Sequence, residues 1–233
     1  MGRWDQLMLW KIAQRLKPTL SALYRRLAQP PVPNLEGDRE IEYSWVAANM
    51  SQGPGNALDF GCGLSWMALM AARKGFDVTA VDLEQISWAY EHSQLRFTRG
   101  DVTELSLAHD SFDLIINCSS VEHVGVPGRY GVSETQTDGD LEVMKLLRQL
   151  LKPGKEMLLT IPVGKDHVFA PRHRVYGPER LPRLLDGWNV LKSEYWGKDD
   201  SNMWTIWEEE PTLKATPLDH YYGLGLFVLT KPD

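Results

Sequence analysis

The 233-residue sequence has only two cysteines, Cys62 and Cys118, and it lacks any long uninterrupted apolar run. Two cysteines do not form a disulfide framework, so we expect reduced thiols and a cytoplasmic protein. A membrane-spanning helix needs about 20 consecutive apolar residues, and no run approaches that length. The N-terminus has no apolar segment followed by a small-residue cleavage site, so we expect no signal peptide.

An excess of basic residues is also missing, because the formal net charge is -6. A nucleic-acid-binding surface is normally basic, so the sequence argues against a nucleic-acid partner. Hydrophobic residues make up 43% of the chain and charged residues 24%, which suits a globular domain with a full core.

Basic charge is concentrated in residues 1–30, where the only acid is Asp5. Apolar residues recur there at steps of three and four, which predicts an amphipathic helix with a break or kink at Pro18. Two interpretations stay open: a helix that packs on or covers the main domain, or a basic helix on an anionic membrane. We therefore expect an N-terminal helical extension and linker over residues 1–35 and a single domain over residues 36–233.

Strand and helix patterns alternate along that domain. Strands are expected at 57–60, 76–82, 95–101, 112–118 and 156–164, and helices at 38–50, 64–75, 84–93 and 138–152. This alternation predicts a Rossmann-like α/β fold, a doubly wound and mostly parallel sheet. Two later strand patterns, at 188–196 and 221–231, have no full helix between them, so we expect an antiparallel C-terminal strand. The segment between them, near 197–220, is predicted to be an insert.

A glycine turn, "DFGCGLS", follows the first predicted strand. In open parallel sheets ligands bind beyond the carboxyl ends of the strands, and Gly61 and Gly63 allow the backbone to come close to one. The dinucleotide fingerprint G-x-G-x-x-G fails here because Trp66 stands at the third glycine. Asp59 would repel a pyrophosphate but would suit a ligand with a positive charge. Asp82, about 20 residues further on, can accept hydrogen bonds from ribose hydroxyls.

Five segments occur in an informative order: "ALDFGCGLSWMA", "VTAVDLE", "FTRGDVTEL", "SLAHDSFDLIINCSSVEHV" and "LLKPGKEMLLTIPVG". Together they resemble the class I S-adenosylmethionine-dependent methyltransferases, in particular the branch that methylates small molecules. The resemblance runs from about Asn56 to Gly164. It departs from the family pattern at Ser65, where a third glycine is usual.

The resemblance implies S-adenosyl-L-methionine as the cofactor and a set of residues around it. Asp59, Gly61, Cys62 and Gly63 would line the methionine part, Asp82 and Leu83 the ribose, Asp101 and Val102 the adenine, and Asn117 and Cys118 would offer backbone carbonyls near the ammonium group. Methyl transfer from a sulfonium needs alignment and a dry site, and a base helps when the nucleophile is a hydroxyl.

His123, in the loop after the fourth strand, is the best candidate for that base, although it could instead shape the cofactor pocket. Other polar residues are candidates for binding the acceptor: Glu122, Arg129, Tyr130, His167, Arg174 and Tyr176. The arginines could hold a carboxylate or phosphate. Glu122, His123, His167 and His173 match no known spacing of metal ligands, so we expect no metal.

The sequence therefore predicts a methyltransferase acting on oxygen or nitrogen of a small molecule or glycan. A non-catalytic module that only binds the cofactor stays open, because the same glycines and acids would serve it. The segments "HRVYGPERL" and "GRYG…DGDLEVMKLLRQLLKPG" also resemble a little-studied bacterial group of these enzymes, which would suggest sugar or cell-envelope chemistry. A membrane-bound helix at residues 1–30 would place the protein at the inner face of the membrane.

Overall fold

The structure is a computed structural model, and it describes residues 34–128, 130, 135–219 and 222–232. The chain divides into two units, residues 1–34 and residues 35–233, and the second unit is the one described below. The predicted helix within residues 1–30 and the candidate residue Arg129 lie outside the described residues. The proposed domain boundary near residue 35 stays a prediction.

The second unit contains strands and helices along its whole described length. In chain order they are α2 (Arg39–Asn49), β1 (Gly55–Phe60), α3 (Met67–Arg73), β2 (Phe76–Asp82), β3 (Leu95–Arg99), β4 (Phe112–Cys118), the 3-10 turn η1 (Val121–His123), α4 (Gly139–Leu150), β5 (Leu151–Val163), β6 (His167–Phe169), β7 (His173–Val175), α5 (Arg180–Leu184), β8 (Asn189–Lys198), β9 (Trp204–Trp207), α6 (Glu209–Lys214) and β10 (Gly223–Thr230).

Eight strands form one sheet in the order β3-β2-β1-β4-β5-β10-β8-β9. The first five are parallel, whereas β10 runs antiparallel to both β5 and β8. This confirms the predicted Rossmann-like sheet with an antiparallel C-terminal strand. Strands β6 and β7 form a separate two-stranded sheet, and the insert near 197–220 contains β9 and α6.

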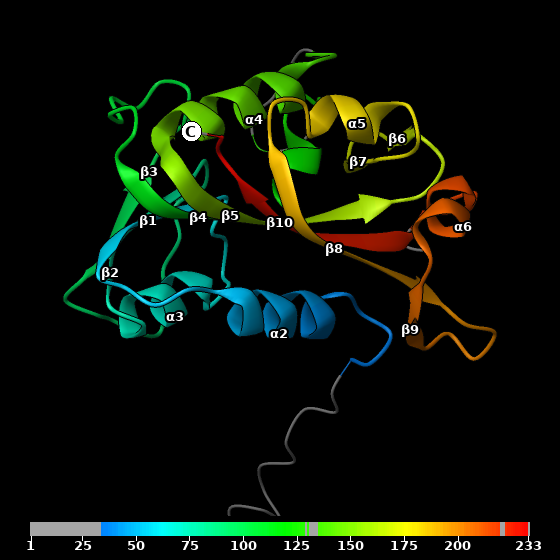
Figure 1. The fold of residues 1–233 in the computed structure, drawn as a ribbon, viewed down its shortest axis with the longest axis horizontal. Coiled ribbons are helices and arrows are strands. Elements are labelled where there is room, and N and C mark those ends of the chain that lie inside the picture. The colour runs from blue at the N-terminus through cyan, green and yellow to red at the C-terminus, as the bar shows by residue number, and fades with distance from the viewer. Residues whose placement is uncertain (1–33, 129, 131–134, 220–221, 233) are drawn as a thin grey trace, which may run out of the picture. The chain divides into compact units, whose positions relative to one another are not determined.

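Helices cover the large sheet on both faces, with α2 and α3 on one side and α4 and α5 on the other (Figure 1). On the face covered by α2 and α3, Trp45 and Val46 of α2 pack with alanines of α3 and with side chains from β1, β2, β4 and β10. On the opposite face Met144 and Leu147 of α4 pack with the alternate side chains of the same strands. Burial on both faces explains the continuous apolar runs of β4 and β5.

One predicted helix is wrong: residues 84–93 contain no helix. The segment is held by its aromatic side chains instead. The Trp88 indole N–H donates to the Gly63 carbonyl at 2.9 Å, and the Tyr90 hydroxyl donates to the Ser65 carbonyl at 2.5 Å. Trp88 also stacks on Tyr90, with ring centroids 5.3 Å apart. These tertiary contacts with the glycine turn outweigh the local helix propensity.

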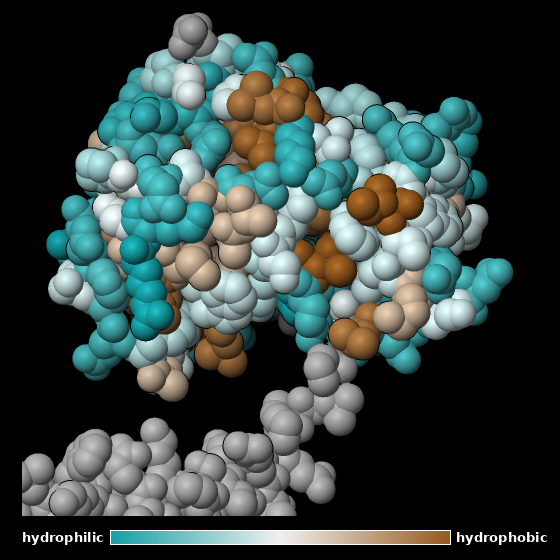
Figure 2. Space-filling model, turned by 60° about the horizontal axis from the view of Figure 1, so that its bottom comes forward, coloured by the Kyte–Doolittle hydropathy of each residue, from teal (hydrophilic) through white to brown (hydrophobic). Residues whose placement is uncertain are grey.

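On the face that Figure 2 shows, apolar side chains stand in separate patches among polar ones. Among the described residues, exposed apolar side chains include Val190, Leu191 and Ile206. Scattered apolar residues of this kind are common at protein surfaces and do not by themselves mark an interface. Within the described part of the chain no helix is both long and apolar enough to cross a membrane.

Candidate active site

The carboxyl ends of the parallel strands place the predicted acids at one edge of the sheet. Strands β3, β2, β1 and β4 are consecutive neighbours and run in the same direction. Asp59 lies near the end of β1, Asp82 ends β2, Asp101 follows β3, and Asn117 lies near the end of β4. Residues far apart in the sequence therefore meet at the edge where this type of fold binds ligands.

The glycine turn between β1 and α3 is fixed from both sides. Gly61 and Gly63 have left-handed backbone conformations, with φ of 66° and 49°. The Gly63 N–H donates to Asp82 Oδ2 at 2.9 Å, and the Ser120 hydroxyl donates to the Gly61 carbonyl at 3.0 Å. The turn is therefore tied to the ends of β2 and β4 at once.

The two glycines differ in their surroundings. A Cβ on Gly61 would lie 2.4 Å from Ser120 Oγ, so a side chain there would collide with the loop after β4. A Cβ on Gly63 would meet no atom within 4 Å. Gly61 is thus required by packing within the protein. Gly63 has its N–H and carbonyl bonded to Asp82 and Trp88, but the space beside its Cα is open to a ligand. Helix α3 begins only at Met67, later than the sequence pattern suggests, so the turn itself forms this part of the site.

The predicted ribose and adenine residues lie beside this turn. Asp82 Oδ1 accepts the Glu84 N–H at 2.9 Å, so its two carboxylate oxygens order the backbone on both sides of the site. Leu83 is 39% exposed, Asp101 accepts hydrogen bonds from Thr103, and Val102 is buried. Contacts of these residues with a cofactor stay predictions.

Asp59 is a buried carboxylate with an unused oxygen. It is 2% exposed, and its Oδ2 has no hydrogen-bond partner among the described residues. Burial raises the pKa of Asp59 to about 7, against a hydrogen bond from the Ala68 backbone and with a further rise from Asp82. A buried polar atom left unpaired costs about 1–3 kcal/mol, so a ligand that donates a hydrogen bond or carries positive charge fits this position.

The end of β4 organises the opposite wall. The buried Asn117 side chain accepts the Val121 N–H at 3.2 Å and so shapes η1 rather than pointing at a cofactor. Cys118 is half-buried, and burial raises the pKa of its thiol. The predicted role of the Asn117 and Cys118 carbonyls stays a prediction.

A buried carboxylate that sequence analysis missed joins α2 to this wall. Glu42 is fully buried and accepts hydrogen bonds from Ser119, from Thr160 at 2.7 Å and from Arg39 at 2.6 Å. Burial raises the pKa of Glu42, and Arg39 opposes that rise. A carboxylate on the face of α2 that also carries Trp45 was the available signal in the sequence.

Turn η1 places Glu122 and His123 beside each other. The His123 Nδ1 lies 2.6 Å from the Arg172 carbonyl, and its Nε2 lies 3.7 Å from Glu122 Oε1. Glu122 is 2% exposed, and its Oε2 has no hydrogen-bond partner in the described part of the chain. Burial raises the pKa of Glu122 to about 8, with a smaller contribution in the same direction from Glu42.

Rings extend from His123 along the strands of the small sheet. His123 lies 5.6 Å from Tyr130 and 6.4 Å from His173 between ring centroids. His173 continues to Phe169 at 5.7 Å, and Phe169 to His167 at 4.2 Å. Tyr130 therefore lies beside the candidate base, whereas His167 lies at the far end of the row. Among the described residues no group of three or more His, Cys, Asp and Glu side chains could hold a metal ion.

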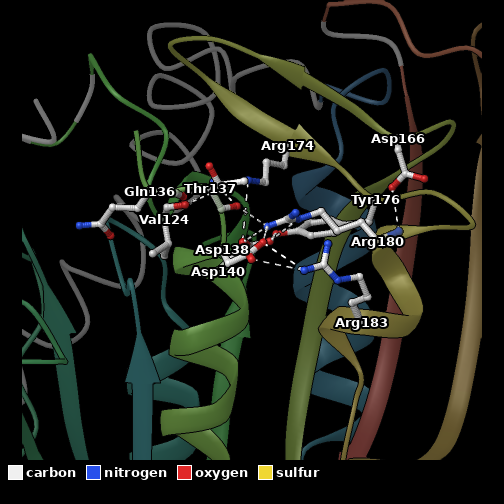
Figure 3. A network of polar contacts seen from close by, with 10 residues as sticks. All are labelled: Val124, Gln136, Thr137, Asp138, Asp140, Asp166, Arg174, Tyr176, Arg180 and Arg183. Atoms are coloured by element: carbon white, nitrogen blue, oxygen red, sulfur yellow. Dashed lines mark hydrogen bonds and ion pairs between the residues drawn. The ribbon is translucent and has the colours of Figure 1, made fainter. Parts of the chain in front are cut away.

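The structure gives Arg174 and Tyr176 a different role from the predicted acceptor contacts. Arg174 is 3% exposed and donates to the carbonyls of Val124 and Gln136, and Tyr176 is fully buried and donates to Asp140 (Figure 3). Side chains saturated by internal contacts are not available to clamp a substrate.

Three further residues of this network were missed from the sequence. Asp140 accepts from Arg180 Nε at 2.9 Å, and Asp166 accepts the backbone N–H groups of Gly177, Glu179 and Arg180. Segment 173–181 thus contacts segment 138–154 through Arg180 and Asp140. No local pattern indicated that pairing.

Sequence comparisons relate this chain to a protein family and to a methyltransferase. The family model described as "Caenorhabditis protein of unknown function, DUF268" matches residues 62–218. A ubiquinone biosynthesis O-methyltransferase from Xanthomonas campestris pv. campestris is 29% identical over 166 residues, which is 68% of this chain. This chain spans 63% of that relative's length.

Solved structures show the same fold. The 1,6-didemethyltoxoflavin-N1-methyltransferase of Burkholderia thailandensis, with bound S-adenosylhomocysteine, superposes with a TM-score of 0.60 at 17% identity, covering 96% of this chain and 90% of that one. The cyclase SpnF superposes with a TM-score of 0.56 at 15% identity, covering 95% and 94%. The chain therefore belongs to the family described as "Caenorhabditis protein of unknown function, DUF268", and it has the fold of the class I S-adenosylmethionine-dependent methyltransferases.

Proposed function

We propose that the protein is an S-adenosylmethionine-dependent methyltransferase that transfers a methyl group to an oxygen or nitrogen atom of a small molecule or glycan. The glycine turn carries this proposal. It presents the open space beside the Cα of Gly63, between Asp82 and the loop after β4, at the edge of the sheet where ligands bind. The methyltransferase relative and the fold add support.

The residues around the turn fit the proposed cofactor. The unpaired Asp59 oxygen suits an ammonium group, and the open side of Gly63 admits a ligand without a steric clash. Asp82 ends β2 at the position expected for a ribose contact. When bound, the cofactor supplies a methyl group activated on a positively charged sulfur, so the protein's own task is to position the acceptor and remove its proton.

We propose His123 as the base that takes this proton. The Arg172 carbonyl can only accept a hydrogen bond, so His123 Nδ1 carries the proton and the lone pair of the neutral ring lies on Nε2. An imidazole fixed in this tautomer suits a general base near neutral pH. Glu122, 3.7 Å from Nε2, is proposed to contact the acceptor, as is Tyr130 beside the ring.

The competing proposal is a non-catalytic module of this fold that binds S-adenosylmethionine and transfers no methyl group. The likeness to the cyclase SpnF is the observation that favours it, because a shared fold does not fix a reaction. Glycines and acids that hold the cofactor would be the same in both cases. Turnover, and not cofactor binding, distinguishes the two.

Isothermal titration with S-adenosylhomocysteine and a product-release screen test the proposal together. We expect binding to the wild type and release of S-adenosylhomocysteine with at least one acceptor from a panel of nucleotide sugars, glycans and small acids. His123→Ala should keep the affinity and lose turnover of a hydroxyl acceptor. No binding refutes the cofactor site, and binding without turnover across the panel favours the non-catalytic alternative.

A further inference from the structure

A buried arginine holds both ends of the segment that joins η1 to α4. Arg174 Nη1 donates to the Val124 carbonyl at the start of this segment. Its Nη2 donates to the Gln136 carbonyl at 2.9 Å and lies 3.5 Å from the Thr137 carbonyl, at the end of the segment. Figure 3 shows the Arg174 side chain extending toward Val124, Gln136 and Thr137. One planar group therefore fixes the base of the whole connection.

The fully buried carboxylate of Asp140 compensates the positive charge of Arg174. Arg174 Nε lies 3.9 Å from Asp140 Oδ1, and Asp140 also accepts from the Tyr176 hydroxyl at 3.1 Å and from Arg180 Nε at 2.9 Å. We call Arg174, Tyr176, Arg180 and Asp140 the loop-base clamp. A buried ion pair with several hydrogen bonds holds its members in one geometry, because removing a partner leaves a buried charge uncompensated.

Two contacts connect the loop-base clamp to His123, the proposed general base. Val124, whose carbonyl Arg174 holds, directly follows His123 in the chain. Arg172, whose carbonyl lies 2.6 Å from His123 Nδ1, stands two residues before Arg174. The same short segment thus fixes the backbone after His123 through a side chain and the imidazole ring through a carbonyl.

We propose that Arg174 is a positioning residue for His123: it holds η1 against residues 172–174, so that the imidazole keeps its hydrogen bond to the Arg172 carbonyl. This inference rests on the proposed role of His123 as the base. General-base catalysis depends on placement within a fraction of an ångström, so loss of the fork-shaped contact lowers turnover. The glycine turn is held by other contacts, to Asp82 and to Ser120, the residue before η1.

Arg174→Lys tests this proposal, with Arg183→Met as the matched control. Lysine keeps a positive charge near Asp140 but cannot hold carbonyls at both ends of the segment. Arg183 is an exposed arginine, and among the described residues its guanidinium is paired with the exposed carboxylate of Asp138. Both variants should bind S-adenosylhomocysteine within about twofold of the wild type, because the residues on the glycine turn are unchanged.

The decisive readout is the NMR spectrum of the His123 ring, assigned by comparison with His123→Gln. In the wild type we expect the Nδ1–H tautomer, and in Arg174→Lys a shifted titration and faster amide exchange at Val124. With any acceptor found by the product-release screen, kcat should fall about tenfold while the cofactor affinity is kept. Arg183→Met should match the wild type in all of these measurements.

Two results would overturn the positioning role. One is an Nε2–H tautomer of His123 in the wild type, which needs no variant to observe. The other is an Arg174→Lys protein whose His123 titration and Val124 exchange match the wild type. Failure to bind S-adenosylhomocysteine or to turn over any acceptor would instead count against the proposed function, since the NMR measurements require neither.

Discussion

Substitution of the two glycines of the turn should separate folding from cofactor binding. Alanine in a left-handed conformation costs about 1–2 kcal/mol, and this cost applies to Gly61→Ala and Gly63→Ala alike. At Gly61 the new methyl group also meets Ser120 Oγ at 2.4 Å and Ser120 Cβ at 2.6 Å. Overpacking of this kind adds about 1–3 kcal/mol. Gly61→Ala should therefore lose about 2–5 kcal/mol of unfolding free energy, and Gly63→Ala only about 1–2 kcal/mol.

Urea unfolding followed by circular dichroism measures the first effect, and titration with S-adenosylhomocysteine measures the second. Gly63→Ala places its methyl group in space that the proposed cofactor uses, so its affinity should fall about tenfold or more. Ser120→Gly removes the colliding atoms, and the double variant Gly61→Ala/Ser120→Gly should regain the clash energy after correction for Ser120→Gly alone. Equal unfolding free energies for the two alanine variants, without recovery in the double variant, would refute this reasoning.

Three further predictions concern other parts of the chain. Asp82→Ala removes the acceptor of the Gly63 and Glu84 N–H groups and should weaken S-adenosylhomocysteine binding by about tenfold or more, whereas Asp77→Ala, at an exposed position of the same strand, should not; equal affinities would contradict the site assignment. Because burial raises the pKa of Asp59 to about 7 and of Glu122 to about 8, these two side chains hold more protons in the folded protein than in the unfolded chain between about pH 4 and pH 8. The unfolding free energy should therefore fall as the pH rises through this window, and Glu122→Gln should make the fall smaller; an unchanged slope in urea titrations would count against the raised pKa. If residues 1–30 form a basic interfacial helix, flotation with anionic liposomes should be lost when they are deleted, and flotation of both forms or of neither would exclude that role.

The sequence was sufficient to place residues whose position follows from strand periodicity. Asp59 and Asp82 stand at the ends of apolar runs, and parallel strands bring such ends to one edge, so their proximity could be predicted. The glycine turn was equally readable, because left-handed backbone favours glycine. The predicted strands and helices that the structure confirms are those that follow from the local spacing of apolar residues and from the parallel direction of the strands.

Contacts that join distant segments were beyond that reasoning. Glu42 accepts hydrogen bonds from Ser119 and Thr160, which lie 77 and 118 residues away in the sequence. The residues around Glu42 give no indication of those partners. A helix was predicted at residues 84–93 from their local pattern. The hydrogen bonds of Trp88 and Tyr90 to the glycine turn, which hold the segment in another conformation, join residues about 25 positions apart and leave no local signal. Arg174 was predicted to bind the acceptor, because the sequence around it carries no signal for the backbone carbonyls that it holds.

The position of β10 has a consequence for biosynthesis. The last strand in chain order lies inside the sheet, between β5 and β8, and pairs with both. A growing chain can form β1 to β5 and the β8–β9 hairpin before Gly223 has left the ribosome, but no strand lies between β5 and β8 until β10 emerges. Until then the apolar edges of β5 and β8 stay unpaired, so the nascent protein passes through a stage at which sheet-edge association is most dangerous.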